Sequence, residues 1–360
     1  MTDLAARLAA DTLALIDIAS ESRGESAILD EVRARLRGAS RLRLVQDEDS
    51  VIAALPERRA GVPLVLLAGH VDTVPLAGAR RPASLEGEVV HGRGAADMKG
   101  ALAVMLRLAT GGAGGADVEL GYLFFGREEI SITESALLPA FDRCPELRDA
   151  ALAIVMEPTA NELEVGCNGN LNALVSVRGR AAHTARPWLG ENAIHTAIEA
   201  LAPVADLPAR DVDVEGLTFR EVMSVTRIDG GVAANVVPDH VRAHVNFRYA
   251  PTRSAMEAET RVRELLDHPH VELELLGNAP PGPVCLANPL VTRLREVGDL
   301  QVGPKQAWTP VAEFGIVGVD AVNLGPGEPR YAHSDDEQVS TTALVTAHAI
   351  VSAFLAGMEA

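Results

Sequence analysis

The sequence contains few aromatic residues, few lysines and few cysteines. Aromatic residues make up 3% of the chain and hydrophobic residues 48%, so we expect cores built from Ala, Val and Leu. Only Lys99 and Lys305 are lysines, and the 50 acidic residues outnumber the 32 basic ones. The formal charge of −18 argues against nucleic acid or an anionic membrane as a partner.

Cysteines and long apolar runs carry no targeting or disulfide signal. The three cysteines form no CxxC pair, so neither a zinc knuckle nor a disulfide framework is indicated, and a reducing compartment is favoured. No apolar run approaches the roughly 18 residues of a membrane span. Residues 1–20 have the spacing of an amphipathic helix, interrupted by charges, rather than the pattern of a secretory signal. We therefore expect a cytoplasmic protein.

The first part of the chain alternates helical patterns with short apolar runs. The whole chain has 360 residues, a length that suits about two domains. Helices are expected near 4–17, 26–38 and 98–109, between strand-like runs such as PLVLLAGH, VELGYLFF and ALAIVME. This alternation predicts an α/β layer in which helices cover a largely parallel sheet.

The pattern changes near residue 171 to longer alternating segments, with helices expected near 191–203 and 252–267. Two β-α-β units of this kind predict an antiparallel sheet with helices on one face. The Pro- and Gly-rich residues 278–284 indicate an exit linker, after which the first pattern resumes. We therefore expect an α/β catalytic domain of residues 1–170 and 285–360, with an α+β domain of residues 171–284 inserted into it.

Histidine and acidic residues follow the strand-like runs of the first pattern. His70 ends PLVLLAGH, Glu128 and Glu129 follow VELGYLFF, and Glu157 ends ALAIVME. Ligands of open α/β sheets collect at the carboxyl ends of strands. Because imidazoles and carboxylates at one sheet edge are what a pair of hydrolytic metal ions requires, we predict a metallohydrolase. His333, in the loop before the last helix, is a further candidate ligand.

The spacing of these residues suggests which of them bind metal, which orients a ligand and which accepts a proton. His70 and Asp72 face the same side of an extended strand, so we interpret His70 as a ligand and Asp72 as the group that orients its ring. Asp97 follows the glycine-rich GRGAAD and has two oxygens, which can bridge cations about 3.5 to 4 Å apart. Glu128 and Glu129 are adjacent, so we expect one to bind metal and the other to accept a proton from the attacking water.

Seven segments in a fixed order resemble a known pattern. GHVDTVP, GRGAADMKG, FFGREEI, MEPT, GRAAHTARPWLGENAI, GGVAANVVPD and AHSDDE are similar to those of the co-catalytic zinc aminoacylase and carboxypeptidase family of metallopeptidases. The resemblance spans nearly the whole chain. It implies a zinc-peptidase-like, three-layer catalytic domain and an inserted lid domain through which two copies form a homodimer. It also implies two zinc ions per subunit, with cobalt as an alternative in one site.

The same resemblance implies a role for each residue of the site. The general base would be Glu128, and family members often have a cis peptide after the bridging aspartate, here Asp97-Met98. The implied ligands are Asp97 for both ions, His70 and Glu157 for one, and Glu129 and His333 for the other.

In the inserted domain, the resemblance implies three further functional residues. His183 is similar to a histidine that reaches into the partner subunit's site and stabilises the oxyanion of the reaction. Asn235 and Arg248 match substrate-contacting positions, and Arg248 suits a bidentate carboxylate clamp. Arg178 and Arg186 are additional candidates for binding an anionic substrate.

Within the family, the resemblance points to members that hydrolyse N-succinyl-LL-2,6-diaminopimelate to succinate and LL-2,6-diaminopimelate, on the route to lysine. Those members often have Asp at the position of Pro310 and Lys at that of Ser334, near the end of the substrate pocket. Deacylation of N-acetylornithine, other N-acyl amino acids or dipeptides therefore stays open as an alternative. A non-catalytic amino-acid-binding protein on the same fold is a remoter one, marked by loss of a ligand or of the base.

Overall fold

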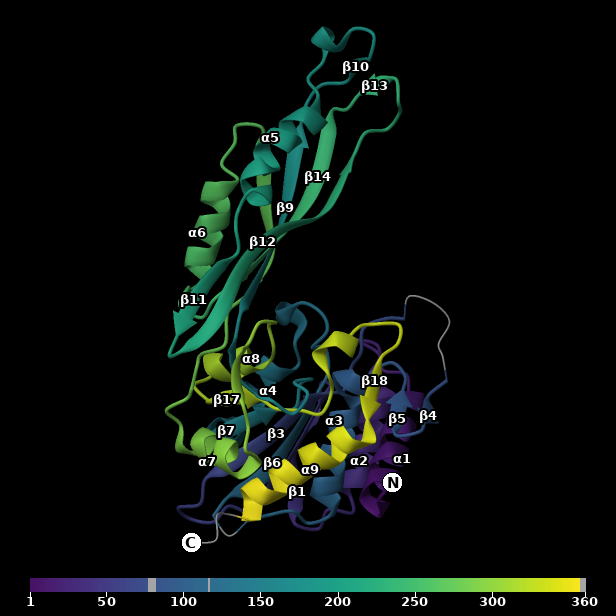
Figure 1. Ribbon diagram of the computed structural model, residues 1–360, viewed down its shortest axis with the longest axis vertical. Coiled ribbons are helices and arrows are strands. Elements are labelled where there is room, and N and C mark those ends of the chain that lie inside the picture. Colours follow the sequence, from purple (N-terminus) through teal and green to yellow (C-terminus); the bar gives the residue numbers. More distant parts are fainter. Residues whose placement is uncertain (77–81, 116, 357–360) are drawn as a thin grey trace. The chain divides into compact units, whose positions relative to one another are not determined.

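The chain forms two compact units in a computed structural model that describes residues 1–76, 82–115 and 117–356. The first unit contains Met1–Gly166, Cys285–Gly303 and Thr309–Ala360. The second contains Cys167–Val284 and Pro304–Trp308, so it interrupts the first along the chain. Figure 1 labels the helices and strands of both units.

An eight-stranded mixed sheet forms the centre of the first unit, in the order β1-β2-β6-β3-β7-β17-β8-β16. The four strands β6, β3, β7 and β17 are parallel, whereas β1, β2 and β8 pair in antiparallel fashion. Every residue of β3 and β6 is buried, as expected of parallel strands covered on both faces. The strands are β1 (Leu42–Glu48), β2 (Val51–Pro56), β3 (Leu64–His70), β6 (Glu119–Phe125), β7 (Ala150–Val155), β8 (Leu163–Cys167), β16 (Val302–Lys305) and β17 (Ala321–Asn323).

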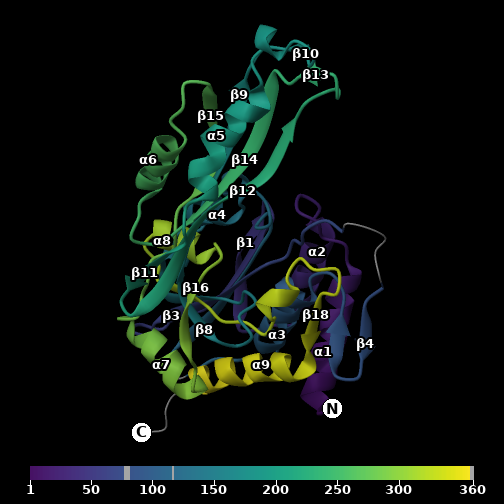
Figure 2. The same ribbon diagram turned by 45° about the horizontal axis from the view of Figure 1, so that its top comes forward.

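Helices cover both faces of this sheet. α4 and α8 lie on the opposite side from α7 and α9 (Figures 1 and 2), and Phe141 of α4 packs edge-on against Phe314 of α8 with ring centroids 5.3 Å apart. α1 and α3 pack against α9. Among the described residues, no helix has the length and apolarity to cross a membrane. The helices are α1 (Asp3–Asp17), α2 (Ser26–Leu36), α3 (Gly100–Thr110), α4 (Leu137–Arg143), α7 (Pro289–Gly298), α8 (Val311–Ile316) and α9 (Thr341–Ala356).

A small three-stranded sheet joins two segments of the first unit that are far apart in the sequence. Its order is β18-β5-β4, and β18 (Gln338–Ser340) is antiparallel to β5 (Val89–His91), which pairs with β4 (Ser84–Glu86). Because the pairing is antiparallel, the segment that precedes β18 meets the segment that follows β5. Single helical turns occupy Ala95–Lys99, Ile132–Glu134, Pro145–Asp149 and Pro329–Tyr331.

The second unit is a five-stranded antiparallel sheet in the order β11-β12-β14-β9-β15, with two helices packed on it. Buried and half-buried residues alternate along β9 and β14, which gives the sheet one apolar face. The elements are β9 (Gly169–Arg178), β10 (Ala182–His183), the turn Pro187–Leu189, α5 (Ala193–Ala205), β11 (Arg210–Val214), β12 (Leu217–Gly230), β13 (Val236–Val237), β14 (His240–Tyr249), α6 (Ala255–Leu265) and β15 (Val271–Ala279).

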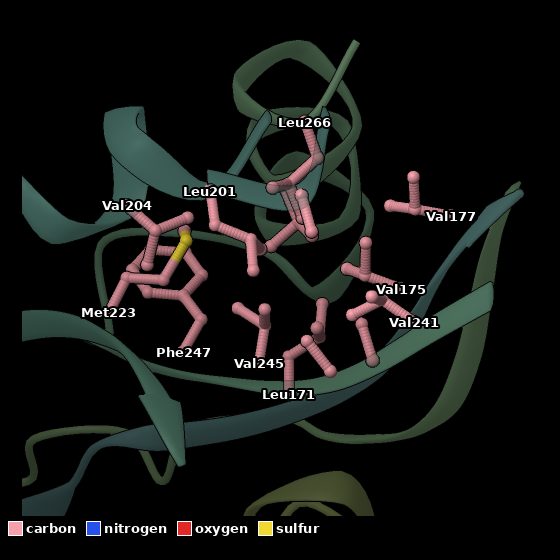
Figure 3. Close-up of a cluster of buried hydrophobic side chains, with 14 of the residues drawn as sticks. Leu171, Val175, Val177, Leu201, Val204, Met223, Val241, Val245, Phe247 and Leu266 are labelled. Atoms are coloured by element: carbon pink, nitrogen blue, oxygen red, sulfur yellow. The ribbon is translucent and has the colours of Figure 1, made fainter. Parts of the chain in front are cut away.

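The core of the second unit lies between its helices and the apolar face of the sheet. Figure 3 shows Val175, Val245 and Phe247 of the sheet pointing toward Leu201 of α5 and Leu266 beyond α6. Aliphatic side chains dominate this cluster, as the low aromatic content predicts. Burial on one face explains why the residues between these positions, on the other face of the same strands, are polar.

Candidate metal centre

Three neighbouring parallel strands place acidic and histidine side chains at one edge of the main sheet. His70 is the last residue of β3, the pair Glu128-Glu129 follows β6, and Glu157 follows β7. Because β6, β3 and β7 are adjacent and parallel, their carboxyl ends meet. The sheet therefore gathers these groups from distant parts of the sequence.

Asp97 links two of the histidines through different oxygens of its carboxylate. Its Oδ1 lies 2.9 Å from Nε2 of His70, and its Oδ2 lies 3.4 Å from Nε2 of His333. Asp97 sits in the turn Ala95–Lys99 with an irregular backbone, and its bond to Met98 is cis, which confirms the expectation for that peptide. This is the arrangement in which one carboxylate serves two cations.

The candidate ligand atoms fall into overlapping groups in which all atoms lie within 4.8 Å of one another. Two of the groups have Asp97 in common. The third group combines His70 with both glutamates that follow β6. Imidazole nitrogens and carboxylate oxygens together are a donor set that suits zinc. The groups are His70, Asp97 and Glu157; Asp97, Glu129 and His333; and His70, Glu128 and Glu129.

Glu128 and Glu129 differ in what they face. Both carboxylate oxygens of Glu129 lie near Nε2 of His333, at 3.1 and 3.0 Å. Glu128 belongs only to the group of His70, Glu128 and Glu129, which Glu129 shares. Glu129 therefore lies with Asp97 and His333 as well as with His70, whereas Glu128 lies with His70 and Glu129.

Asp72 contacts both His70 and the turn that carries the two glutamates. Nδ1 of His70 lies 3.0 Å from the main-chain carbonyl oxygen of Asp72 and 3.6 Å from its Oδ1. The Asp72 carboxylate accepts hydrogen bonds from the amides of Glu128 and Glu129, both at 3.1 Å, and from the Ser22 hydroxyl at 2.7 Å. The sequence predicts only the contact of Asp72 with the ring, and the contacts with the two amides of the turn arise from the fold.

Glu25 binds the amide of Arg127, which precedes the two glutamate amides in the turn that follows β6. Its Oε1 accepts hydrogen bonds from the amides of Arg23, at 2.7 Å, and Arg127, at 3.2 Å. Arg127 has the left-handed φ of 61°, which turns its amide and the next two toward carboxylates. Three successive amides, at 127–129, thus bind Glu25 or Asp72. Ser22 and Glu25 were missed from sequence because they lie just before α2, where acidic and hydroxyl residues ordinarily mark a helix start.

Crowded carboxylates make the site strongly attractive to cations. Burial acts to raise the pKa of Asp97, but hydrogen bonds to His333 and His70 outweigh it and hold that pKa well below its usual range. Hydrogen bonds to Asp97 and Glu129 raise the pKa of His333 to about 10. Burial, followed by the negative charge of Glu157, raises the pKa of Glu128 well above that of an ordinary glutamate. A raised pKa makes the Glu128 carboxylate a better proton acceptor, which suits a general base.

The remaining predicted residues belong to the second unit. His183 is exposed and pairs with Val236 where β10 meets β13. The main-chain oxygen of Asn235 accepts a hydrogen bond from the amide of Thr184 at 3.1 Å, so Asn235, which directly precedes β13, lies beside the strand that ends at His183. The exposed Arg178 ends β9, and Arg186 precedes the turn Pro187–Leu189.

Arg248 lies near the end of β14, on the face of the sheet away from the apolar core. It is half-buried, and its Nε donates to Oδ1 of Asn246 at 3.2 Å. Asn246 in turn donates to the side chains of Asn170 and Asn172, at 2.7 and 2.8 Å. Burial lowers the pKa of Arg248. The asparagines form a polar patch around Arg248 that was not predicted from the sequence, although their alternation with apolar residues in β9 and β14 places them on this face.

Comparison with known proteins identifies relatives over nearly the whole chain. The sequence profile of peptidase family M20/M25/M40 matches residues 66–357. The chain is 41% identical over 347 residues to a Mycobacterium tuberculosis protein assigned as a succinyl-diaminopimelate desuccinylase, covering 96% of this chain and 97% of the relative. It is 35% identical over 355 residues to the succinyl-diaminopimelate desuccinylase of Corynebacterium glutamicum, covering 96% and 95%.

A solved structure shares the fold at low sequence identity. The M20 family metallo-carboxypeptidase Sso-CP2 from Sulfolobus solfataricus superposes with a TM-score of 0.77 at 19% identity, covering 99% of each chain. At this identity the likeness supports only the fold, an α/β architecture with an additional α+β unit.

Proposed function

Because this chain belongs to peptidase family M20/M25/M40, we propose that it is a two-metal amidohydrolase that cleaves N-succinyl-LL-2,6-diaminopimelate into succinate and LL-2,6-diaminopimelate. The names of the two full-length bacterial relatives support the substrate. The geometry around Asp97 supports the metal pair.

The single observation that carries the metal pair is the division of the Asp97 carboxylate between His70 and His333. One zinc ion would be held by Asp97 with His70 and Glu157. The other would be held by Asp97 with Glu129 and His333, and cobalt is an alternative in one of the two. When bound, such ions polarise an amide carbonyl and lower the pKa of water.

Glu128 is the general base of this proposal. Glu129 faces His333 and fills a ligand position, which leaves Glu128 as the carboxylate beside His70 with a raised pKa. It takes a proton from the attacking water and later delivers that proton to the leaving amine. Asp72 fixes the His70 ring and the amides of the turn, so that the base and the neighbouring ligand keep their positions.

Binding of an acidic substrate requires positive charge that the chain has to supply locally, because its net charge is −18. Arg248 is assigned to a substrate carboxylate, since a guanidinium binds a carboxylate through two parallel hydrogen bonds. Its place in a patch of asparagines fits a polar substrate. Asn235 is assigned as a second contact, with Arg178 and Arg186 as additional candidates.

A homodimer through the second unit completes the proposal. Large apolar side chains are exposed there, and a second copy of the chain would cover them. In addition, beyond Glu221 the described part of β12 pairs only with β14 and presents a free edge to a partner strand. His183 would then act in the partner's site, on the oxyanion of the reaction. The exposed residues are Trp188, Leu189, Ile198, Val222, Ile228, Val232, Met256 and Leu276.

Metal removal and reconstitution test the proposed reaction. Protein stripped with a chelator should release no amine from N-succinyl-LL-2,6-diaminopimelate, and two equivalents of zinc should restore hydrolysis. Full activity in the stripped protein would contradict the metal mechanism. Failure of the zinc-loaded protein to hydrolyse any N-acyl amino acid would contradict amidohydrolase activity altogether.

A further inference from the structure

Two loops that carry candidate ligands are joined by the small sheet of the first unit. Asp97 lies in the segment that follows β5, and His333 lies in the segment that precedes β18. The pairing of Gln338 with His91 is continued by a hydrogen bond from the amide of Gly92 to the Glu337 carbonyl oxygen, at 3.0 Å. The two segments are therefore adjacent where the metal ligands begin.

The Glu337 side chain binds the main chain of the Asp97 segment. Glu337 is only 3% exposed. Its Oε1 accepts hydrogen bonds from the amides of Ala96, at 3.2 Å, and Asp97, at 3.0 Å. It appears in none of the groups of candidate ligands, so its carboxylate serves the backbone of a ligand rather than a metal ion.

Arg93 joins the opposite side of the Glu337 carboxylate to the His333 segment. Its Nη1 lies 2.8 Å from Oε2 of Glu337 and 3.2 Å from the carbonyl oxygen of Ser334, the residue after His333. A buried carboxylate is costly unless it is paired and hydrogen-bonded, and here a guanidinium and two amides meet that need. The Arg93-Glu337 pair therefore connects the backbones of both segments.

We propose that Arg93 and Glu337 are positioning residues for the metal pair, which hold the Asp97 carboxylate and His333 at the separation that a bridged site requires. This inference rests on the proposed function, because it concerns the same site. Asp97 has to present one oxygen to each histidine, and a small rotation of its backbone would withdraw one of them. Groups that orient ligands commonly change metal affinity by about 10- to 100-fold when they are mutated.

The test is the zinc affinity of Glu337→Gln. Glutamine keeps the size of the side chain and one acceptor oxygen, but loses the charge that pairs with Arg93. Metal-free wild type and variant are titrated with zinc in competition with a chromophoric chelator, and the visible spectrum of the cobalt form reports ligand geometry. We expect about 10- to 100-fold weaker binding of at least one ion and an altered cobalt spectrum in the variant. Arg93→Met removes the cation that pairs with Glu337 and changes no candidate ligand. It should weaken zinc binding in the same way, and it tests the proposal if Glu337→Gln does not fold.

Glu119→Gln is the matched control. Glu119 is also 3% exposed, accepts a hydrogen bond from the amide of Arg59 and pairs with Arg58 at 2.8 Å, but it lies at the start of β6, the end remote from the site. It should lower the midpoint of urea unfolding and leave zinc affinity within about twofold of wild type.

The outcomes separate this inference from the proposed function. If wild type binds two zinc ions and Glu337→Gln binds them equally tightly with an unchanged cobalt spectrum, the positioning role is wrong. Equal loss of affinity in Glu119→Gln would also overturn it, because general destabilisation would then be the cause. If wild type itself fails to bind two ions, the proposed metal centre fails, and the inference fails with it.

Discussion

At the scale of single residues, the site is defined by which oxygen faces which ring. Asp97 divides its carboxylate between His70 and His333, and Glu129 faces His333 with both oxygens. The sequence indicated His70, Asp97 and Glu129 because each follows an apolar run or a glycine-rich approach, whereas His333 lies in a loop and was only a further candidate ligand. Adjacency alone left Glu128 and Glu129 interchangeable, and only the family resemblance assigned Glu128 as the base and Glu129 as the ligand.

Replacement of Glu128 tests the division of roles. Glu128→Gln should keep both zinc ions and lose about 10²- to 10⁴-fold in kcat, because it removes the proton acceptor and preserves the shape of the side chain. Metal content and kcat measured on the same sample check this. Loss of an ion in Glu128→Gln, with retention of both in Glu129→Gln, would mean that the two roles are exchanged.

Glu313 gives the chain a pH dependence of stability that is separate from catalysis. It is fully buried in α8. Burial raises its pKa to about 7, against smaller opposing effects of Ser135 and Leu138. The folded chain therefore keeps this proton to higher pH than the unfolded chain, so the stabilising contribution is full below about pH 4.5 and is lost as the pH rises through 7.

Glu313→Gln should remove the loss of folding stability that the titration of Glu313 causes at high pH. At pH 8 the variant is expected to unfold with a free energy about 2 to 3 kcal/mol higher than wild type, and near pH 4 the difference should largely vanish. Urea unfolding at the two pH values measures it. The exposed Glu296→Gln serves as a control, with changes within about 0.5 kcal/mol at both. An equal effect of Glu313→Gln at both pH values would exclude titration of this group as the cause.

At the scale of elements, strand ends were predictable and loop pairing was not. The apolar run that becomes β3 ends at His70, and those that become β6 and β7 end shortly before Glu128 and Glu157, so the positions of these residues follow from hydrophobic pattern alone. Glu337 binds the amide of Ala96, 241 residues away, only because β18 pairs with β5. Nothing in the short run AHSDDE distinguishes Glu337 from the neighbouring acids, so its contact emerges only from the fold.

Gly327 lies close to the residues that precede Asp97 and follow Glu157, so a larger residue there tests how rigidly these two ligand-bearing loops must be held. A Cβ at this position would meet the Ala96 carbonyl oxygen and lie 2.9 Å from Cβ of Pro158, beside Asp97 and Glu157 respectively. Gly327→Ala should cost about 1 to 3 kcal/mol of stability and weaken zinc binding, because the backbones next to two ligands must move apart. Gly303→Ala, where no atom lies within 4 Å of the added Cβ, is the control for unfolding and metal titration. Unchanged zinc affinity in Gly327→Ala would show that the loops tolerate the displacement.

At the scale of the whole molecule, the chain consists of two units with different sheets. The change from short apolar runs to alternating segments predicted this difference, because strands buried on both faces and strands buried on one face have different sequence patterns. The strand order β6-β3-β7-β17 does not follow the chain and required the structure. The homodimer, and with it the role of His183, stays a prediction.

Mixed dimers test whether the active site is shared. His183→Ala should lower kcat with both metals bound, because the residue lies outside the candidate ligand groups. Refolding or coexpression of His183→Ala with Glu128→Gln should restore part of the activity, since a mixed dimer contains one site with both an intact base and an intact partner histidine. Activity no higher than the average of the two parent variants would place His183 outside a shared site.

The most direct test of the whole account is the substrate preference of the zinc-loaded enzyme. We expect kcat/KM for N-succinyl-LL-2,6-diaminopimelate to exceed that for N-acetylornithine and for small dipeptides by more than tenfold, which corresponds to about 1.4 kcal/mol of preferential transition-state binding. A preference below tenfold, or a higher kcat/KM for either competitor, would contradict the assignment as a desuccinylase.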